Sequence, residues 1–341
     1  MAETDLFAAA RNGSLGQIPK TKLTSERLAE RNAAGNTAVH LAAKYGSLRE
    51  LPAKALTSEL LTLKNDAGYT PLHHAAIGGN LDKLPAAIAT SENLSIRSNA
   101  GYTTFHLAAA YGHLDQLPPG LLTAEIVSKT TDLGNTLLHE AAENGTLTRI
   151  PPEYLTPEGI AQKNLSGETV LHVAAFNGHL DQVPESLLTE AAMRETTSAG
   201  DTVFHASAIS GHLEQIPAAL MTRDNLVIAS KTGFTAIHAA AETGQLGKIP
   251  RSRVTAELLM TRNDNGDTPL HAAAFEGHLD QVPPQFLTAE RMSTRNYEGI
   301  SVVRLADERG HLEQIPDSGR PKSYGPLRRL IRRFSSTRAP F

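Results

Sequence analysis

Several features that are common in proteins are absent from this 341-residue sequence. It contains no cysteine and no tryptophan. Without cysteine, neither a disulfide framework nor a thiolate metal site is possible. The first residues, MAETDLFAAARNG, lack a basic start and a long apolar run, so the sequence predicts no signal peptide, and we expect a cytoplasmic location. No stretch approaches the ~20 consecutive apolar residues that a membrane-spanning helix needs.

A strong overall charge is also absent, because the formal net charge is only −4. The charge is nevertheless uneven: from Asp317 onward there are seven Lys or Arg and one acid, so the preceding body carries −10. A mildly acidic body with a basic end is not typical of a dedicated nucleic-acid-binding protein. We therefore expect a protein partner and consider a nucleic acid an unlikely one.

What the sequence has instead is a period of 33 residues that continues without an insertion. Proline recurs at this spacing in ten members, from Pro19 to Pro316. Glycine recurs in two registers, one from Gly13 to Gly310 and one whose members are Gly35, Gly68, Gly101, Gly134, Gly167, Gly200, Gly233, Gly266 and Gly299. Such a period indicates one supersecondary unit that is copied and stacked.

The unit that starts at Gly68 shows how each copy is predicted to fold. Thr70 followed by Pro71 is a helix-start signal, because threonine caps free N–H groups and proline fits the first turn. Paired alanines follow on the helix, and Gly79 is expected to end it in the left-handed conformation. Small alanine side chains would let neighbouring helices approach closely.

The second half of each unit is predicted to be broken by proline. Proline comes four residues after an apolar leucine such as Leu81, so the helix there is limited to about one turn or a 3₁₀ segment. A threonine register from Thr24 to Thr288 follows, usually with an acid two residues later, and predicts a short capped helix. A polar stretch such as Asn65–Gly68 then predicts a turn or hairpin tip.

These residues resemble ankyrin repeats. The Thr-Pro-Leu-His-x-Ala signature is intact at Thr70–Ala75 and at Thr268–Ala273, and Gly-His-Leu follows it in several units, as at Gly112 and Gly178. The resemblance covers residues 2–316 and implies an all-α, ankyrin-like solenoid of about ten units with exposed hairpin loops. One departure is systematic, because ankyrin units normally continue from Gly-His-Leu into an uninterrupted second helix.

The resemblance also sets the predicted domain organisation. We expect a repeat domain over residues 1–318, with an N-terminal cap at 1–33, repeats at 34–297 and a C-terminal cap at 298–318. The caps are degenerate: Phe7 stands where the other units have His40 and its copies, and Arg304 replaces that histidine near the C-terminus. Residues 319–341 break the period and are predicted to form a basic, flexible tail.

Fourteen histidines raise the question of a metal or catalytic site. Eight lie in one register from His40 to His271, and five lie in the Gly-His-Leu register, so only His74 is outside both. Register mates are expected about 8–10 Å apart, whereas zinc ligands lie about 2 Å from the metal. The first register is therefore expected to bridge units by hydrogen bonds. We predict no metal, no cofactor and no catalytic residues.

Function is expected where the repeat varies. The position after the tip glycine, called here the tip position, and the position after the paired alanines, called the helix position, differ from unit to unit. In ankyrin-like stacks these positions line the loop tips and the concave face, where aromatic residues serve as binding anchors. The aromatic candidates are Tyr69, Tyr102, Phe176, Phe234 and Phe275. The alternative is that some of them pack against a neighbouring loop.

The tail offers a second functional hypothesis. Arg328, Arg329, Arg332 and Arg333 alternate with apolar residues at helical spacing, which is typical of a short basic amphipathic segment. Such a segment could contact an anionic membrane surface or another polyanion. The main prediction is a non-catalytic, monomeric protein-interaction scaffold, and the alternative is a peripheral adaptor that is tethered through this tail.

Overall fold

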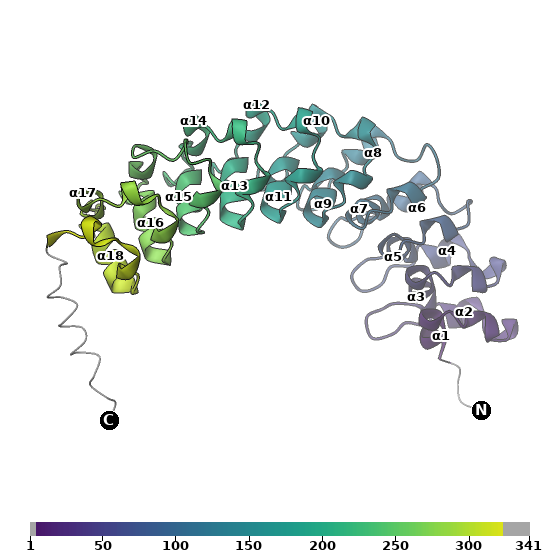
Figure 1. The fold of residues 1–341 in the computed structure, drawn as a ribbon. Coiled ribbons are helices and arrows are strands. Elements are labelled where there is room, and N and C mark those ends of the chain that lie inside the picture. The colour runs from purple at the N-terminus through teal and green to yellow at the C-terminus, as the bar shows by residue number, and fades with distance from the viewer. Residues whose placement is uncertain (1–4, 323–341) are drawn as a thin grey trace, which may run out of the picture. The chain divides into compact units, whose positions relative to one another are not determined.

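The computed structural model describes residues 5–322, and its contacts divide the chain into two compact units. Unit 1 extends to Leu188, and unit 2 begins at Thr189. Both are all-α helical repeat solenoids, which confirms the predicted fold class (Figure 1). Between residues 5 and 322 there is no named strand, and only isolated bridges occur, such as the one between Lys163 and Thr169. None of the described helices is long and apolar enough to cross a membrane.

The main element of each repeat is a helix of seven or eight residues. In unit 1 these helices are α1 (Leu6–Asn12), α3 (Ala38–Tyr45), α5 (Pro71–Gly78), α7 (Thr104–Ala110), α9 (Leu137–Asn144) and α11 (Val170–Asn177). In unit 2 they are α13 (Val203–Ser210), α15 (Ala236–Glu242), α16 (Pro269–Glu276) and α18 (Val302–Arg309). Within each unit, consecutive helices of this set pack side by side.

The predicted caps explain where these helices begin and end. The Thr70 side chain accepts a hydrogen bond from the N–H of His73, and Pro71 occupies the first helical position. At the other end, Gly79 adopts φ 65° and ψ 45°, and its N–H bonds to carbonyls of the last turn. The Thr–Pro start and the glycine stop therefore act as the sequence predicts.

The proline register limits the next element to a single 3₁₀ turn. After α5 the chain forms η5 (Leu81–Lys83), and Leu84 is then extended at φ −70° and ψ 143°. A residue before proline is disfavoured in the helical region, so the turn cannot continue. The equivalent turns are η1 (Leu15–Gln17), η3 (Leu48–Glu50), η6 (Leu114–Gln116), η7 (Leu147–Arg149), η9 (Leu180–Gln182), η11 (Leu213–Gln215), η13 (Leu246–Lys248), η15 (Leu279–Gln281) and η17 (Leu312–Gln314).

A second 3₁₀ turn often follows the proline. These turns are η2 (Lys20–Lys22), η4 (Ala53–Ala55), η8 (Pro152–Tyr154), η10 (Glu185–Leu187), η12 (Ala218–Leu220), η16 (Pro284–Phe286) and η18 (Asp317–Gly319).

The threonine register then caps a short helix of four residues. In α6 (Ser91–Leu94), for example, Thr90 accepts a hydrogen bond from the N–H of Asn93, and Glu92 lies in the first turn. The others are α2 (Ser25–Leu28), α4 (Ser58–Leu61), α8 (Ala124–Val127), α10 (Pro157–Ile160), α12 (Glu190–Met193), α14 (Arg223–Leu226) and α17 (Ala289–Met292). At the corresponding place after Thr255 the chain forms the 3₁₀ turn η14 (Leu258–Met260) instead.

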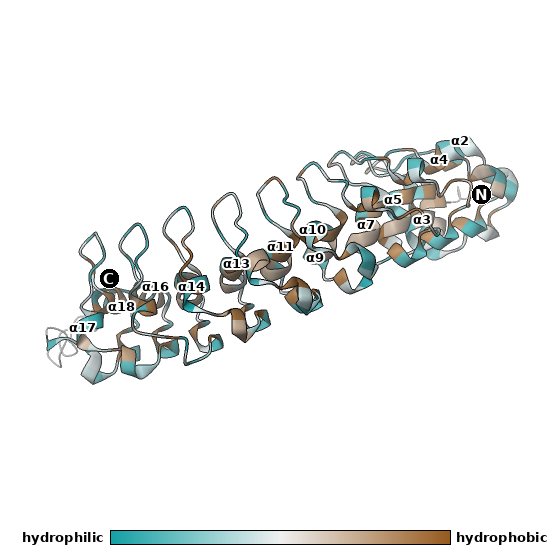
Figure 2. Cartoon of the chain, turned by 90° about the horizontal axis from the view of Figure 1, so that it is seen from above, coloured by the Kyte–Doolittle hydropathy of each residue, from teal (hydrophilic) through white to brown (hydrophobic). Residues whose placement is uncertain are grey.

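The core of each unit lies between the long helices and these short elements. The paired alanines, such as Ala75 and Ala76, have no exposed surface, so neighbouring helix backbones approach closely. The leucine that begins the 3₁₀ turn after each long helix is also buried in nearly every repeat, as for Leu81 at 2% exposure. Within each unit the loops leave the helix layer on the same side (Figure 2). The loops and the helix face beside them therefore form a continuous surface within each unit.

The glycine at a loop tip provides the first test of this fold. Gly68 has φ +78°, and a Cβ placed there would lie 2.5 Å from the backbone nitrogen of Asn99 in the next loop. Gly299 has the same φ but nothing within 4 Å of its Cβ position. We expect Gly299→Ala to cost about 1–2 kcal/mol for the left-handed backbone alone. Gly68→Ala should cost on the order of 1–3 kcal/mol more, because the next loop must also move. Urea unfolding of the two variants measures this difference, and equal losses would contradict the close loop packing.

Candidate interaction surface

Each loop tip is closed by its own side chain and backbone. In the loop before α5, the Asn65 side-chain oxygen accepts hydrogen bonds from the N–H groups of Ala67 and Tyr69. The Asn65 N–H also donates to the Tyr69 carbonyl at 2.8 Å, and Gly68 closes the turn by donating to the Asn65 carbonyl. The tip is thus a compact turn that presents its side chains in a defined direction.

Neighbouring tips are joined by a ladder of single backbone hydrogen bonds. In unit 1 the N–H to carbonyl pairs are Asp66 to Ala34, Asn99 to Ala67, Asp132 to Ala100 and Leu165 to Leu133. In unit 2 they are Lys231 to Ala199, Asp264 to Thr232 and Tyr297 to Asn265. The ladder fixes the spacing of the tip side chains within each unit.

The first histidine register joins each helix start to the following loop. The Nδ1 atom of His73 accepts a hydrogen bond from the Thr70 N–H at 3.1 Å, so the neutral ring carries its proton on Nε2. That Nε2 lies 3.0 Å from the Tyr102 carbonyl of the next repeat, to which it donates. The same bridge, to a carbonyl 29 residues further on, recurs from His40 to Tyr69, His139 to Glu168, His205 to Phe234, His238 to Asp267 and His271 to Ile300. His106 bonds instead to the carbonyl of Lys129, 23 residues further on. This is the structural role that the sequence predicts for the register.

Burial keeps these histidines neutral. It lowers the pKa of His40, His73, His106 and His238 to about 4. Protonation would place a second hydrogen on Nδ1, which already faces a backbone N–H in most of these capping boxes. A positive charge would also be desolvated there, so the bridge depends on an uncharged ring.

The second histidine register makes a bridge in the opposite direction. The Nδ1 atom of His113 lies 2.8 Å from the Ala76 carbonyl at the end of the preceding helix, and His179 makes the same contact with Ala142. Where the register holds another polar residue the contact persists, as from Asn80 to the Ala43 carbonyl and from Thr146 to the Ala109 carbonyl. These residues therefore cap the free carbonyls at the helix ends.

His74, the histidine outside both registers, lies on the loop side of α5. Its ring centroid is 5.2 Å from that of His40, and its Nδ1 is buried without a hydrogen-bond partner. Burial and the nearby His40 and Lys44 lower the pKa of His74 to about 3. Among residues 5–322 there is no group of three His, Asp or Glu side chains that could hold a metal ion.

The predicted aromatic residues of unit 1 divide into two environments. Tyr69 and Tyr102 are half-buried and pack on the rings of His73 and His106, with centroids 5.4 and 6.3 Å apart. Phe176 stands at the helix position of α11 and is 54% exposed. The two tyrosines thus both pack on the repeat framework, whereas Phe176 is free to contact a partner.

Next to Tyr102 lies a buried carboxyl group that the sequence reading did not single out. Glu140 is 2% exposed and accepts a hydrogen bond from the Asn135 amide at 3.0 Å. Burial raises the pKa of Glu140 to about 7, although the hydrogen bonds from Asn135 and Tyr102 oppose that rise. Burial and, after it, the Glu140 carboxyl raise the pKa of Tyr102 to about 12.

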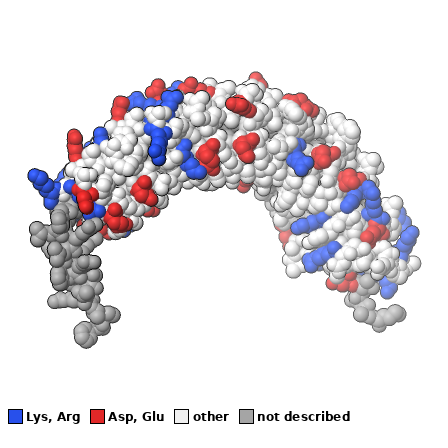
Figure 3. Space-filling view, in the orientation of Figure 1, with Lys and Arg blue, Asp and Glu red and all other residues white. Residues whose placement is uncertain are grey.

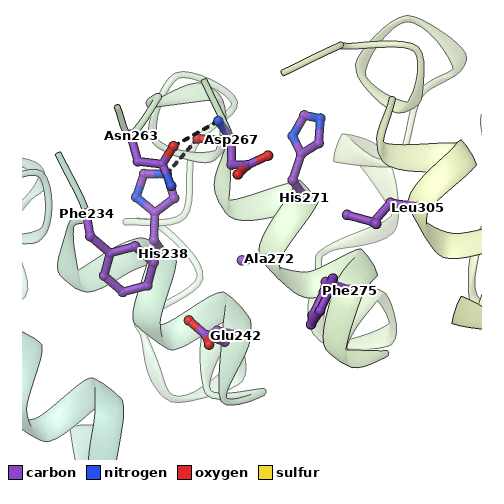
Figure 4. Close-up of a pocket in the computed structure, with 9 residues that line it drawn as sticks. All are labelled: Phe234, His238, Glu242, Asn263, Asp267, His271, Ala272, Phe275 and Leu305. Carbon is purple, nitrogen blue, oxygen red and sulfur yellow. Dashed lines mark hydrogen bonds between the residues drawn. The ribbon is translucent and has the colours of Figure 1, made fainter. Parts of the chain in front are cut away.

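The structure brings the two predicted phenylalanines of unit 2 together in one open pocket. Phe234 comes from the loop before α15, and Phe275 lies on α16 with 40% of its surface exposed. Figure 4 shows the two rings on opposite sides, with Ala272 between them. The pocket has a volume of about 180 Å³, and its polar lining includes Glu242, Asp267, His238 and His271.

Charged side chains of both signs lie on the surface that Figure 3 shows. Figure 3 shows acidic and basic side chains interspersed over the visible face of each unit. The predicted tail residues Arg328, Arg329, Arg332 and Arg333 lie outside the described residues, so their contacts stay a prediction.

Comparison with known families agrees with the repeated geometry. A family model described as "Ankyrin repeats (3 copies)" matches residues 6–84 and 105–188, and one described as "Ankyrin repeat" matches residues 265–287. Together they cover more than half of the chain. The chain belongs to the ankyrin repeat family. Ankyrin repeats are generally protein–protein interaction modules, and proteins of the family are typically non-catalytic. A comparison with curated proteins gave no significant match.

The sequence reading of this ankyrin repeat protein missed the position directly after the first-register histidine. This post-histidine position faces the loop side of the helix, and its residues differ strongly between units. The series is Leu41, His74, Leu107, Glu140, Val173, Ala206, Ala239, Ala272 and Leu305. Alignment of the units by the 33-residue period would have found both the buried Glu140 and the small Ala272.

The neutral histidines predict that acid destabilises the protein. Because their folded pKa values lie below the unfolded value near 6.5, the unfolded chain binds more protons between pH 6.5 and 4. Stability should therefore fall by up to ~1.4 kcal/mol per pH unit for each such histidine as the pH decreases through this window. His106→Gln should reduce the slope of the free energy of unfolding against pH by the amount that corresponds to the uptake of about one proton on unfolding. Thr103→Val, which removes the cap hydroxyl but keeps the imidazole, should lower stability and retain the slope. An unchanged slope in His106→Gln would contradict the neutral bridge.

Glu140 predicts a pH effect of the opposite sign. Its folded pKa of about 7 lies above the ordinary value of 4.5, so the folded state retains a proton that the unfolded state has lost. Its contribution to stability should decline by up to ~1.4 kcal/mol per pH unit as the pH rises from 4.5 to 7. Glu140→Gln should thus be more stable than the parent protein at pH 8, and the gain should shrink at pH 5. Glu143→Gln, at an exposed neighbour, serves as the control, and an equal gain in both variants would argue against a buried carboxyl.

Proposed function

We propose that this protein is a non-catalytic interaction scaffold that binds a protein partner along its loop tips and along the helix face beside them. The observation that supports this most directly is the contrast between framework and variable positions. Threonine, histidine and glycine repeat the same hydrogen bonds in successive repeats. On that framework the exposed apolar residues vary, and they include Leu133, Leu165, Phe176 and Phe275.

A rigid framework favours binding because little conformational entropy is lost when the partner docks. Exposed aromatic and aliphatic side chains are the usual anchors of such interfaces. The first-register histidines, such as His40, His73 and His139, are engaged in bridges between repeats, which gives them a structural role. A monomeric state and a cytoplasmic location belong to the same proposal, and gel filtration and cell fractionation test them.

The second candidate is an adaptor that is tethered through residues 319–341. The sequence observation that favours it is the excess of positive charge from Asp317 onward, with arginines and apolar residues at helical spacing. Such a segment would bind anionic lipid or another polyanion, with an affinity that decreases at high salt. This candidate and the scaffold differ in which part of the chain the partner requires.

Partner capture with three variants tests the proposal. Because Phe176 and Phe275 are the most exposed of the predicted aromatic residues, Phe176→Ala/Phe275→Ala should weaken capture of the principal protein partner by at least about tenfold. Phe286→Ala, at an aromatic outside the tip and helix positions, is the matched control and should retain binding. Deletion of residues 323–341 should also retain it. Circular dichroism checks that each variant keeps its helicity.

Loss of capture on tail deletion alone would favour the tethered adaptor. Equal capture by the Phe176→Ala/Phe275→Ala variant and the parent protein would contradict the assignment of these positions to the interface.

A further inference from the structure

A small side chain, that of Ala272, lies in the lining of the pocket in unit 2 between the two phenylalanine rings. Ala272 occupies the post-histidine position on α16, where Leu41, Leu107 and Leu305 occupy it in other repeats. A leucine there would project from the floor of the pocket into the space between Phe234 and Phe275. Alanine also occupies this position at Ala206 and Ala239, so the pocket depends on Ala272 together with the rings of Phe234 and Phe275 on either side of it.

Aromatic rings form two sides of this hollow. Phe234 is held in place by packing on His238, with ring centroids 5.3 Å apart and the planes tilted by 32°. Phe275 stands at the helix position, and the guanidinium of Arg309 lies 3.5 Å from its ring centroid. The protein itself thus shows that a guanidinium group can stack on this ring.

The polar lining of the pocket is acidic. Glu242 and Asp267 line it, and no lysine or arginine is among its lining residues. The two lining histidines bring no charge, because burial lowers the pKa of both His238 and His271. In each ring Nδ1 contacts the cap threonine of its own helix, and Nε2 bonds to the carbonyl of the next loop. Burial and the neighbouring Glu276 raise the pKa of Glu242 above its ordinary value, so an incoming cation would stabilise its ionised form.

We propose that this pocket receives an arginine side chain from a segment of the protein partner. The guanidinium plane would stack between Phe234 and Phe275 and pair with the carboxylates of Glu242 and Asp267. Arginine fits better than lysine, because its planar group both stacks on aromatic faces and forms two parallel hydrogen bonds to a carboxylate. The inference rests on the proposed function as a protein-binding scaffold, and it adds the chemistry of the residue that is recognised.

Selection from a random-peptide display library, with the full chain as bait, tests the inference. The selected peptides should share an arginine. In a synthetic copy of the strongest binder, replacement of that arginine by citrulline, which keeps the shape and removes the charge, should weaken binding by at least about tenfold. Ala272→Leu should cause a similar loss by filling the pocket.

Two further variants make the test specific. Ala206→Leu carries the same change at the post-histidine position of α13, outside the pocket lining, and should leave peptide binding unchanged. Arg309→Gln removes the cation that already lies on Phe275, so it should strengthen binding of an arginine peptide by about two- to tenfold, whereas it would weaken binding of an acidic one.

The possible outcomes separate this inference from the broader proposal. Binders that lack arginine but are lost in the Phe176→Ala/Phe275→Ala variant would overturn the arginine pocket and leave the scaffold function in place. Peptides that bind the Phe176→Ala/Phe275→Ala variant and Ala272→Leu as tightly as the parent protein would argue against the proposed interface as well. Recovery of no arginine-bearing binder overturns the inference.

Discussion

The hydrogen bond from a neutral histidine to the carbonyl of the next loop is the interaction on which the rest of this structure depends. One ring completes the cap of its own helix through Nδ1 and holds the following repeat through Nε2, as His73 does between Thr70 and Tyr102. Residues of the second register, such as His113, hold the preceding repeat at the end of its helix. These hydrogen bonds connect a repeat to both the preceding and the following one, and they satisfy polar groups that would otherwise be buried without partners.

This polar framework leaves the loop-side face free to vary. The post-histidine position carries a buried acid at Glu140 in unit 1 and only a methyl group at Ala272 in unit 2, although the helices that present them have the same caps. Half-buried Tyr102 therefore packs next to a carboxyl group, whereas exposed Phe275 borders an open acidic pocket. Different surface chemistry arises on one backbone plan because the hydrogen bonds of the caps and bridges do not involve these side chains.

The elements that recur were predictable from the sequence, because each depends on a local rule. Threonine caps, the left-handed glycine stop at Gly79, the 3₁₀ turn before proline and the histidine bridge follow from residue type and spacing alone. The surroundings of single side chains were not predictable in the same way. Whether Tyr69 packs on His73 or faces solvent depends on distances between repeats. The space in the pocket beside Phe275 depends on the small size of the Ala272 side chain. Periodicity specifies the average unit, but the site depends on the differences between units.

The hydrogen-bond ladder along the loop tips has a consequence for how such a chain can change its length. Within each unit a tip N–H bonds to a carbonyl of the tip before it, as Asn99 does to Ala67 in unit 1 and Tyr297 to Asn265 in unit 2. Every link runs from a backbone N–H to a carbonyl 32 residues earlier, and equivalent links recur at the 33-residue period. Loss or duplication of 33 residues would therefore rejoin the ladder, both histidine bridges and the alanine contacts at once, whatever the point of the break. A gain or loss of a length that is not a multiple of 33 would leave buried donors and acceptors unmatched, so a gene of this kind can evolve most easily in whole repeats.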